Sequence, residues 1–264
     1  MAYRYETHMH TSQSSACGRS TGAEHVRYYK ALGYDGVFIT DHFFGGNCAV
    51  DRRLPWPEKV HAFCAGYRDA RAEGDRLGLQ VFFAWEETMD GDDYLVYGCD
   101  EDWLLRHPEI EGASRRAQLE LVHANGGCVV QAHPFRMRDY IQRILLGWRF
   151  CDAVEVANAG NRPQDDVCAC RYAREMGMVM TCGSDNHHSG FDVRDPGVTW
   201  GVETQTRITC PADYVRIILN REPLRLLCPP ERLEKQPGMT IEPSYWLDEN
   251  ERPVPTGRDW LGEE

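Results

Sequence analysis

The sequence predicts an α/β fold arranged as a closed or nearly closed barrel of largely parallel strands. Short apolar runs, typical of buried strands, alternate with amphipathic stretches typical of helices, and at least six such units follow one another. A His or a carboxylate follows nearly every predicted strand, as expected at the carboxyl face of a parallel α/β barrel. A doubly wound open sheet is the competing α/β architecture.

The first half of the chain contains four predicted strands and two predicted helices. Residues 3–9 alternate between polar and apolar side chains, whereas the runs at 36–40 and 79–85 are almost wholly apolar. Ser20 or Thr21 is suited to cap the first helix, and Pro57 suits the first turn of the second. We expect strands over residues 3–9, 36–40, 79–85 and 94–97, and helices over residues 22–32 and 57–77.

The second half continues the alternation until a proline-rich segment interrupts it. Two glycines after residue 125 end the next helix, and a last helix completes the series. We expect helices over residues 113–125, 163–176 and 213–220, and strands over residues 127–131, 153–156 and 178–182. The barrel domain is therefore predicted at 1–228. Residues 229–264 are expected to be an extension with a small hairpin (244–248 and 252–254), and not an independent domain.

Composition limits the partners. The chain has 29 Lys and Arg against 41 Asp and Glu, a formal charge of −12, which argues against binding of long nucleic acids. Its apolar runs are too short to span a bilayer, so we expect no membrane partner. Eleven cysteines, an odd number, without an export signal favour the reducing cytoplasm over a disulfide framework. The sequence does not indicate an oligomeric state.

Several residues that follow predicted strands can bind metals. His8 and His10 are two apart on a strand, so their side chains point to the same side. Together with Glu86 and Asp185 they form a set of nitrogen and oxygen donors that suits zinc, manganese or iron. Further donors follow from the same reasoning: Glu86 could bridge to a second cation with His133, and His42 and His187 remain for a third.

Five motifs, in this order, carry a resemblance to a known family. The sequence resembles the polymerase and histidinol phosphatase (PHP) family of metal-dependent phosphoesterases over about residues 3–190. The family resemblance implies a distorted seven-stranded β/α barrel with two or three divalent ions (zinc, manganese or iron) at the carboxyl ends of the strands. The motifs are His8-Met9-His10-Thr11, Ile39-Thr40-Asp41-His42, Ala84-Trp85-Glu86, Gln131-Ala132-His133-Pro134-Phe135 and Gly183-Ser184-Asp185-Asn186-His187.

The resemblance implies the same ligand sets and shows two departures from the family pattern. The family often has a His shortly after the Glu strand. Here Asp93 is the best substitute, with Asp92 and Tyr94 as competitors. The family also has an acid or a His shortly after the first His pair, and here Cys17 or Ser15 could replace it.

The activity implied by the resemblance is hydrolysis of a small phosphate ester by water activated at the metals. The ester could be a phosphomonoester or a small cyclic phosphodiester, such as a sugar phosphate or a nucleotide. Asp41 could hold the tautomer of a ligand imidazole. Phosphate binding is expected from Arg19, Arg136, Asn158 and Arg162. The alternatives are a nuclease acting on nucleic-acid ends, a non-catalytic metal-binding regulatory barrel, and hydrolysis of a non-phosphate bond.

Overall fold

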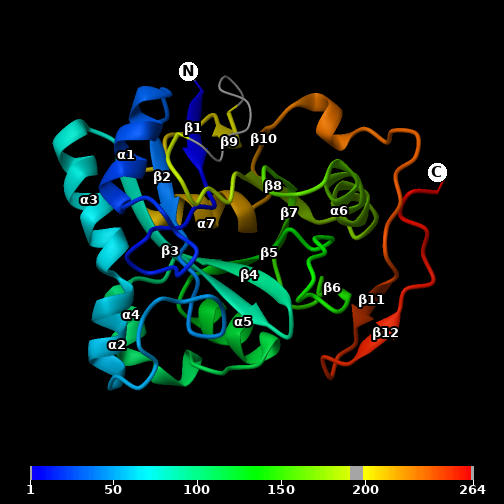
Figure 1. Ribbon diagram of the computed structural model, residues 1–264, viewed down its shortest axis with the longest axis horizontal. Helices are drawn as coiled ribbons and strands as arrows, with labels where there is room; N and C mark the ends of the chain where they lie inside the picture. The colour runs from blue at the N-terminus through cyan, green and yellow to red at the C-terminus, as the bar shows by residue number, and fades with distance from the viewer. Residues whose placement is uncertain (1, 191–198, 263–264) are drawn as a thin grey trace.

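The structure is a computed structural model that describes residues 2–190 and 199–262. It contains a nine-stranded sheet and a three-stranded sheet, with most of the helices on the outside and α7 in the middle of the molecule (Figure 1). The strands are β1 (Tyr3–Glu6), β2 (Gly36–Ile39), β3 (Gln80–Met89), β4 (Asp92–Tyr97), β5 (Cys128–Ala132), β6 (Ile144–Leu146), β7 (Ala153–Asn158), β8 (Val179–Gly183), β9 (Gly201–Thr204), β10 (Leu224–Leu227), β11 (Ser244–Leu247) and β12 (Pro253–Pro255). The helices are α1 (Gly22–Ala31), α2 (Trp56–Phe63), α3 (Ala65–Leu77), α4 (Glu101–Arg106), α5 (Arg115–Ala124), α6 (Pro163–Glu175) and α7 (Pro211–Leu219), with short 3₁₀ turns at Pro108–Ile110 and Pro230–Leu233.

The large sheet is a nearly closed barrel with the order β10-β9-β1-β2-β3-β4-β5-β7-β8. Strands β1, β2, β3, β5, β7 and β8 run in one direction, while β4 and β9 are antiparallel to their neighbours. The segment after β8 closes on the segment after β1, because the Asp185 N–H donates to the His8 carbonyl (2.8 Å) and the His10 N–H donates to the Asn186 carbonyl (2.9 Å). The expected α/β barrel is present, but the sheet has nine strands, so a count of seven is not confirmed.

Two elements differ from the sequence-based expectation near the site. The predicted helix over residues 57–77 is divided at Cys64 into α2 and α3. Gly66, at the start of α3, packs directly on Thr11, so packing against the site sets where α3 begins. The strand predicted over residues 3–9 ends at Glu6, and beyond it the His8 N–H donates to the Glu6 side chain (2.9 Å) and the Met9 N–H to the Thr40 side chain (2.9 Å).

Strands β3 and β4 form a hairpin, whereas helices connect β1 to β2, β2 to β3 and β7 to β8. Asp90 and Gly91 make the two-residue turn, with φ of 54° and 94°. Positive φ at both positions matches the right-handed twist of the strands, and Asp-Gly is a favoured pair for it. The hairpin extends β3 to Met89 and buries Glu87, which accepts a hydrogen bond from the Gly45 N–H (3.1 Å). Glu87 is therefore a buried carboxylate, although it directly follows Glu86 along β3.

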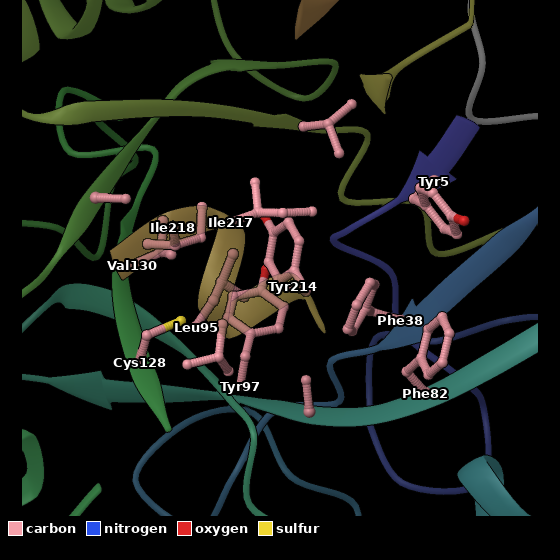
Figure 2. Packing of buried hydrophobic residues seen from close by; sticks show 14 of the residues in the cluster. Tyr5, Phe38, Phe82, Leu95, Tyr97, Cys128, Val130, Tyr214, Ile217 and Ile218 are labelled. Atoms are coloured by element: carbon pink, nitrogen blue, oxygen red, sulfur yellow. The ribbon is translucent and has the colours of Figure 1, made fainter. Parts of the chain in front are cut away.

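Helix α7 fills the barrel interior. Its Tyr214 ring lies 4.9 Å from both the Phe38 and the Tyr97 rings, and Ile217 and Ile218 pack in the same cluster (Figure 2). The Tyr97 hydroxyl donates to the Thr7 carbonyl (2.8 Å), which joins this apolar layer to the segment that carries His8. The polar residues at the strand ends therefore lie next to a closely packed apolar layer.

The predicted tail hairpin is present. Strands β11 and β12 pair antiparallel, and β11 also pairs parallel with β6, which places the tail beside the barrel (Figure 1). The Trp260 Nε1–H donates to the Ser244 hydroxyl (2.7 Å). None of the helices in the described parts of the chain has the length and apolar character required to cross a membrane.

Candidate metal centre

Three groups of metal-binding side chains gather at the carboxyl ends of the strands. Within each group, one ligand atom from each member lies within 4.8 Å of the others. The groups are His8, His10 and Asp185; His8, Glu86 and His133; and His10, His42 and His187. All seven residues were expected at the site from the sequence, although His8 and His10 each take part in two groups.

The distances in the first group fit a bound cation. His10 Nε2 lies 2.9 Å from Asp185 Oδ1 and 3.2 Å from His8 Nε2. Ligands about 2.1 Å from one ion lie about 3.0–3.5 Å from each other in tetrahedral or octahedral geometry. Burial lowers the pKa of His10 well below its usual value, and repulsion from His42 and His187 adds to this. His10 is therefore neutral and offers a lone pair.

Glu86 touches all three groups. Its Oε1 lies 3.2 Å from His8 Nε2 and 3.1 Å from His133 Nε2, and its Oε2 lies 2.7 Å from His42 Nδ1. Burial opposes ionisation of Glu86, but the charges of His42 and His8 outweigh it and hold its pKa well below the usual range. Glu86 Oε2 and His42 Nδ1 are both buried and lie 2.7 Å apart, and neither has a hydrogen-bond partner of good geometry among the described residues. A cation shared by these two atoms fits this pair.

Glu155, which sequence reasoning missed, orients His8. Its Oε1 accepts a hydrogen bond from His8 Nδ1 (3.0 Å), so His8 Nε2 is turned toward the cluster. Its Oε2 accepts from the His133 N–H (3.2 Å) and from Asn158 Nδ2 (2.9 Å). The signal available in the sequence was one carboxylate inside the apolar strand β7.

Asp41 is connected to the imidazoles through other side chains. It accepts hydrogen bonds from the Thr11 N–H (2.6 Å), the Thr11 hydroxyl (2.8 Å) and the Ser15 hydroxyl (2.7 Å). Ser15 Oγ in turn lies 3.3 Å from His10 Nδ1. The expected direct bond from Asp41 to a ligand imidazole is therefore replaced by a bridge through Ser15, whose hydroxyl is already engaged and does not face the cation cluster.

The structure separates the candidates for the two positions that depart from the family pattern. Asp93 faces the site, with Oδ2 3.9 Å from His133 Nε2. Asp92 points the other way and pairs with Arg115, while the Tyr94 hydroxyl donates to Asp92 (2.6 Å). Of these three side chains, Asp93 is the one placed at the site.

Cys17 also lies at the site. It lines the same cavity as His42 and His187. Burial would raise the pKa of the Cys17 thiol, but hydrogen bonds with His187 and His42 lower it to about 6. The Cys17 thiol therefore lies beside two imidazoles that favour its ionised form.

Of the four residues expected to bind phosphate, Arg136 is at the cavity. Its Nη1 donates to Asp185 Oδ2 (2.6 Å) and its Nη2 to Asn158 Oδ1 (2.7 Å). Asn158 is fully buried behind Arg136, so it orients the guanidinium and does not face the cavity. Arg162 pairs with Asp165 and Glu242 and lines a different cavity, so the expectation that it meets substrate beside the metals is not met.

Arg19 is exposed, and it is its backbone N–H that reaches the site, donating to the His187 carbonyl (2.8 Å). The Arg19 side chain is absent from the described lining of the metal cavity. The Arg19 backbone therefore supports the loop that carries His187, and binding of phosphate by the Arg19 side chain stays a prediction.

The cluster opens to a cavity of about 500 Å³. A cavity of that volume can hold a small molecule but not a macromolecule. The lining residues are Cys17, His42, Gly45, Gly46, Asn47, Thr88, Gly91, Asp93, His133, Arg136, Tyr140, Asp185 and His187.

Comparison with solved structures identifies the fold. A two-domain protein from Bacteroides vulgatus that contains a PHP-like metal-dependent phosphoesterase matches with a TM-score of 0.59 and 15% identity, over 84% of this chain and 64% of that protein. A protein from Bifidobacterium adolescentis described as a metal-dependent phosphoesterase matches with a TM-score of 0.50 and 17% identity, over 83% of this chain and 96% of that one. The structural neighbours are thus PHP-like metal-dependent phosphoesterases, as the motifs predicted.

A third neighbour acts on nucleic acid. Endonuclease Q, solved with a duplex that carries an abasic lesion, matches with a TM-score of 0.54 and 10% identity, over 86% of this chain and 58% of that protein. The chain therefore spans less than two thirds of the length of two of these three neighbours. No family model matches the sequence, and no curated protein does. At these identities the likeness establishes the fold, and the neighbours are hydrolases of more than one substrate class.

Proposed function

We propose that this protein is a metal-dependent phosphoesterase that hydrolyses a small phosphate ester, either a phosphomonoester or a small cyclic phosphodiester. One observation carries the proposal. Both oxygens of the buried Glu86 carboxylate face imidazole nitrogens of different groups, at 2.7 to 3.5 Å, which suits a carboxylate that bridges two cations. The cavity beside it contains the Arg136 guanidinium, a donor suited to phosphate oxygens.

The donor types indicate which residues would hold each ion. His8, His10, Glu86 and Asp185 would hold the first ion, Glu86 and His133 with Asp93 the second, and His42 and His187 with Cys17 the third. Imidazole and carboxylate donors suit zinc, manganese or iron. A thiolate at Cys17 would favour zinc over manganese in the third position.

The protein side chains have separate tasks in the proposed reaction. Divalent ions bound here would acidify water and polarise the ester phosphate. Arg136, held by Asn158 and Asp185, would place positive charge beside the phosphate oxygens, where negative charge accumulates in the transition state. Glu155 keeps His8 Nε2 directed at the cluster, and the apolar layer around Tyr97 excludes water from below.

The size and charge of the molecule favour a small substrate over a nucleic-acid strand. The cavity of about 500 Å³ has the volume of a small ligand, and the chain has a formal charge of −12, which repels an extended polyanion. We therefore propose a small phosphorylated molecule as the partner of this site.

Elemental analysis and phosphate release test the proposal together. The purified protein should contain two or three divalent ions per chain, and chelation should abolish release of phosphate from a panel of sugar phosphates and nucleotides. Glu86→Gln should lower both the metal content and the activity at least a hundredfold, because a neutral amide cannot bridge two cations. Glu109→Gln, on the surface, is the matched control.

Three outcomes would contradict the proposal. One is full activity after chelation, and another is a Glu86→Gln protein that retains wild-type activity. The third is cleavage of a single-stranded oligonucleotide without release of phosphate from any small ester, which would favour the nuclease alternative.

A further inference from the structure

A second cavity adjoins the metal cavity. It has a volume of about 450 Å³ and shares Gly91 and Tyr140 with the metal cavity, so the two lie on either side of these residues. Its remaining lining residues are Asp90, Arg115, Gln142, Arg143, Leu145, Leu247, Glu251 and Pro253. The last three of these come from the tail hairpin and the turn within it, so the tail forms one wall.

Tyr140 has an unusual exposure for its position. Its side chain is 79% exposed, although the residue lines both cavities. An aromatic side chain has few rotatable bonds, so ordering it costs little conformational entropy. An exposed ring between two cavities is stabilised most when a flat group of a ligand stacks on its face. Tyr140 is therefore placed to contact a ring in a ligand that extends from one cavity to the other.

The two arginines of the second cavity differ in their partners. Arg115 is buried and pairs with Asp92, Glu251 and Asp90, so its charge is already compensated. Arg143 is exposed and contacts the Tyr245 ring (5.8 Å), and it has no ion pair with any residue that the structure describes. Arg143 is therefore the cation of this cavity that can meet an anionic or hydrogen-bond-accepting group of a ligand.

The tail wall is held in place. The Glu251 carboxylate accepts hydrogen bonds from the N–H groups of Arg115 (3.1 Å) and Arg116 (3.0 Å), at the first turn of α5. Strand β11 is joined to β6 by a parallel ladder. The wall is thus part of the folded surface next to the metal cavity, and not a loose end.

We propose that this second cavity binds the leaving group of the ester, and that the preferred substrate is a phosphate monoester whose alcohol carries a planar ring and an anionic or acceptor group. The inference rests on the proposed function, because the phosphate would lie at the metal cluster. The ring then lies on Tyr140, the acceptor group faces Arg143, and the tail hairpin sets the length of alcohol that fits. The tail segment is on this basis a specificity element.

Substrate selectivity tests the inference. We would measure kcat/KM for adenosine 5′-monophosphate, which carries a ring and acceptors, and for glycerol phosphate, which carries neither a ring nor an extra anion. We expect the ring-bearing ester to be preferred at least tenfold. Tyr140→Ala and Arg143→Gln should each reduce this selectivity ratio about tenfold, the effect of losing one aromatic or charge-assisted contact. Arg149→Gln, a surface arginine that lies over Trp148, should leave the ratio unchanged.

A blocking variant provides an independent test. Gln142 is exposed and lines the second cavity, so Gln142→Trp should fill that cavity without disturbing the core. It should exclude the ring-bearing ester and retain glycerol phosphate as the better substrate. Equal turnover of both esters, or an unchanged ratio in all three cavity variants, would overturn the inference while leaving the proposed function intact. Absence of turnover with both esters and with the wider panel would instead count against the proposed function.

Discussion

At the residue scale, the metal cluster depends on carboxylates that orient imidazoles. Glu155 is the clearest case, because one carboxylate accepts from His8 Nδ1, from the His133 backbone and from Asn158. Three donors converge on two oxygens, so a charged acceptor is required at this position. The shared carboxylate thereby fixes the positions of His8 and His133 relative to each other.

Glu155→Gln should weaken metal binding without removing a ligand. The amide could accept from only one side, and its NH₂ group would face the His133 N–H or Asn158 Nδ2. We expect the affinity for the most tightly held ion to fall about 10–100-fold. Competition with a chromophoric chelator measures this affinity. Glu120→Gln on exposed helix α5 should show no change, and equal affinities in both variants would contradict the role assigned to Glu155.

The sequence predicted which His, Glu and Asp side chains come together better than it predicted the residues that support them. His8, His10, His42, Glu86, His133, Asp185 and His187 each follow or end a strand, where a polar residue is conspicuous. Glu155 lies inside β7, which is buried on both faces, so the sequence does not show which face it occupies. The roles of Asn158 and Ser15 depended on side-chain hydrogen bonds across loops, and residue spacing carries no information about those.

At the element scale, helix α3 presses against the loop that carries the first histidines. A Cβ added to Gly66 would lie 3.0 Å from Asp41 Oδ2 and even closer to Thr11. Gly66 therefore permits the approach that lets Thr11 and Ser15 bond to Asp41, and Ser15 contacts His10. The break between α2 and α3 is thus coupled to the geometry of the site.

Gly66→Ala should destabilise the fold and the site together. Although alanine favours helices, overpacking against Thr11 should lower the free energy of unfolding by about 1–3 kcal/mol, as measured in urea. Metal affinity should fall as well, because His10 loses its support. Ala72→Gly, exposed on the same helix, should cost about 1 kcal/mol through helix propensity and leave metal affinity unchanged. A Gly66→Ala protein as stable as wild type would contradict this account.

Helices and strands with clear local sequence signals were predicted. Those that depend on contacts with distant parts of the chain were not. Capping of α1 was narrowed to Ser20 or Thr21, and the structure has Thr21, with Glu24 completing a capping box. Strands β6, β9 and β10 were not predicted, and each is defined by the strand with which it pairs. The division at Cys64 was missed, although Gly66 lies two residues beyond it.

At the scale of the whole molecule, buried neutral histidine should make stability depend on pH. Burial lowers the pKa of His25 to about 4, although the His10 carbonyl bonded to its Nε2 partly opposes this shift. The unfolded chain has the ordinary value of about 6.5, so between these values it binds more protons than the folded chain. Stability is therefore complete above pH 6.5 and declines as the pH falls toward 4.

His25→Gln isolates this contribution, because glutamine can retain the hydrogen bond but does not titrate. From pH 7 to pH 5, the wild-type free energy of unfolding should fall by about 2 kcal/mol more than that of the variant. Urea unfolding of the chelated protein at both pH values measures the difference. Parallel decreases in the two proteins would contradict the assignment to His25.

The near closure of the barrel between the segments after β1 and β8 has a consequence for the order of events during synthesis. The candidate ligands run from His8 to His187, so most of the described chain separates the first from the last. On a ribosome, His8 and His10 emerge long before Asp185 and His187, and the long-range pairing that joins them is slow to form. A complete cation site can therefore exist only after the barrel has closed, which makes metal loading a late event that follows folding.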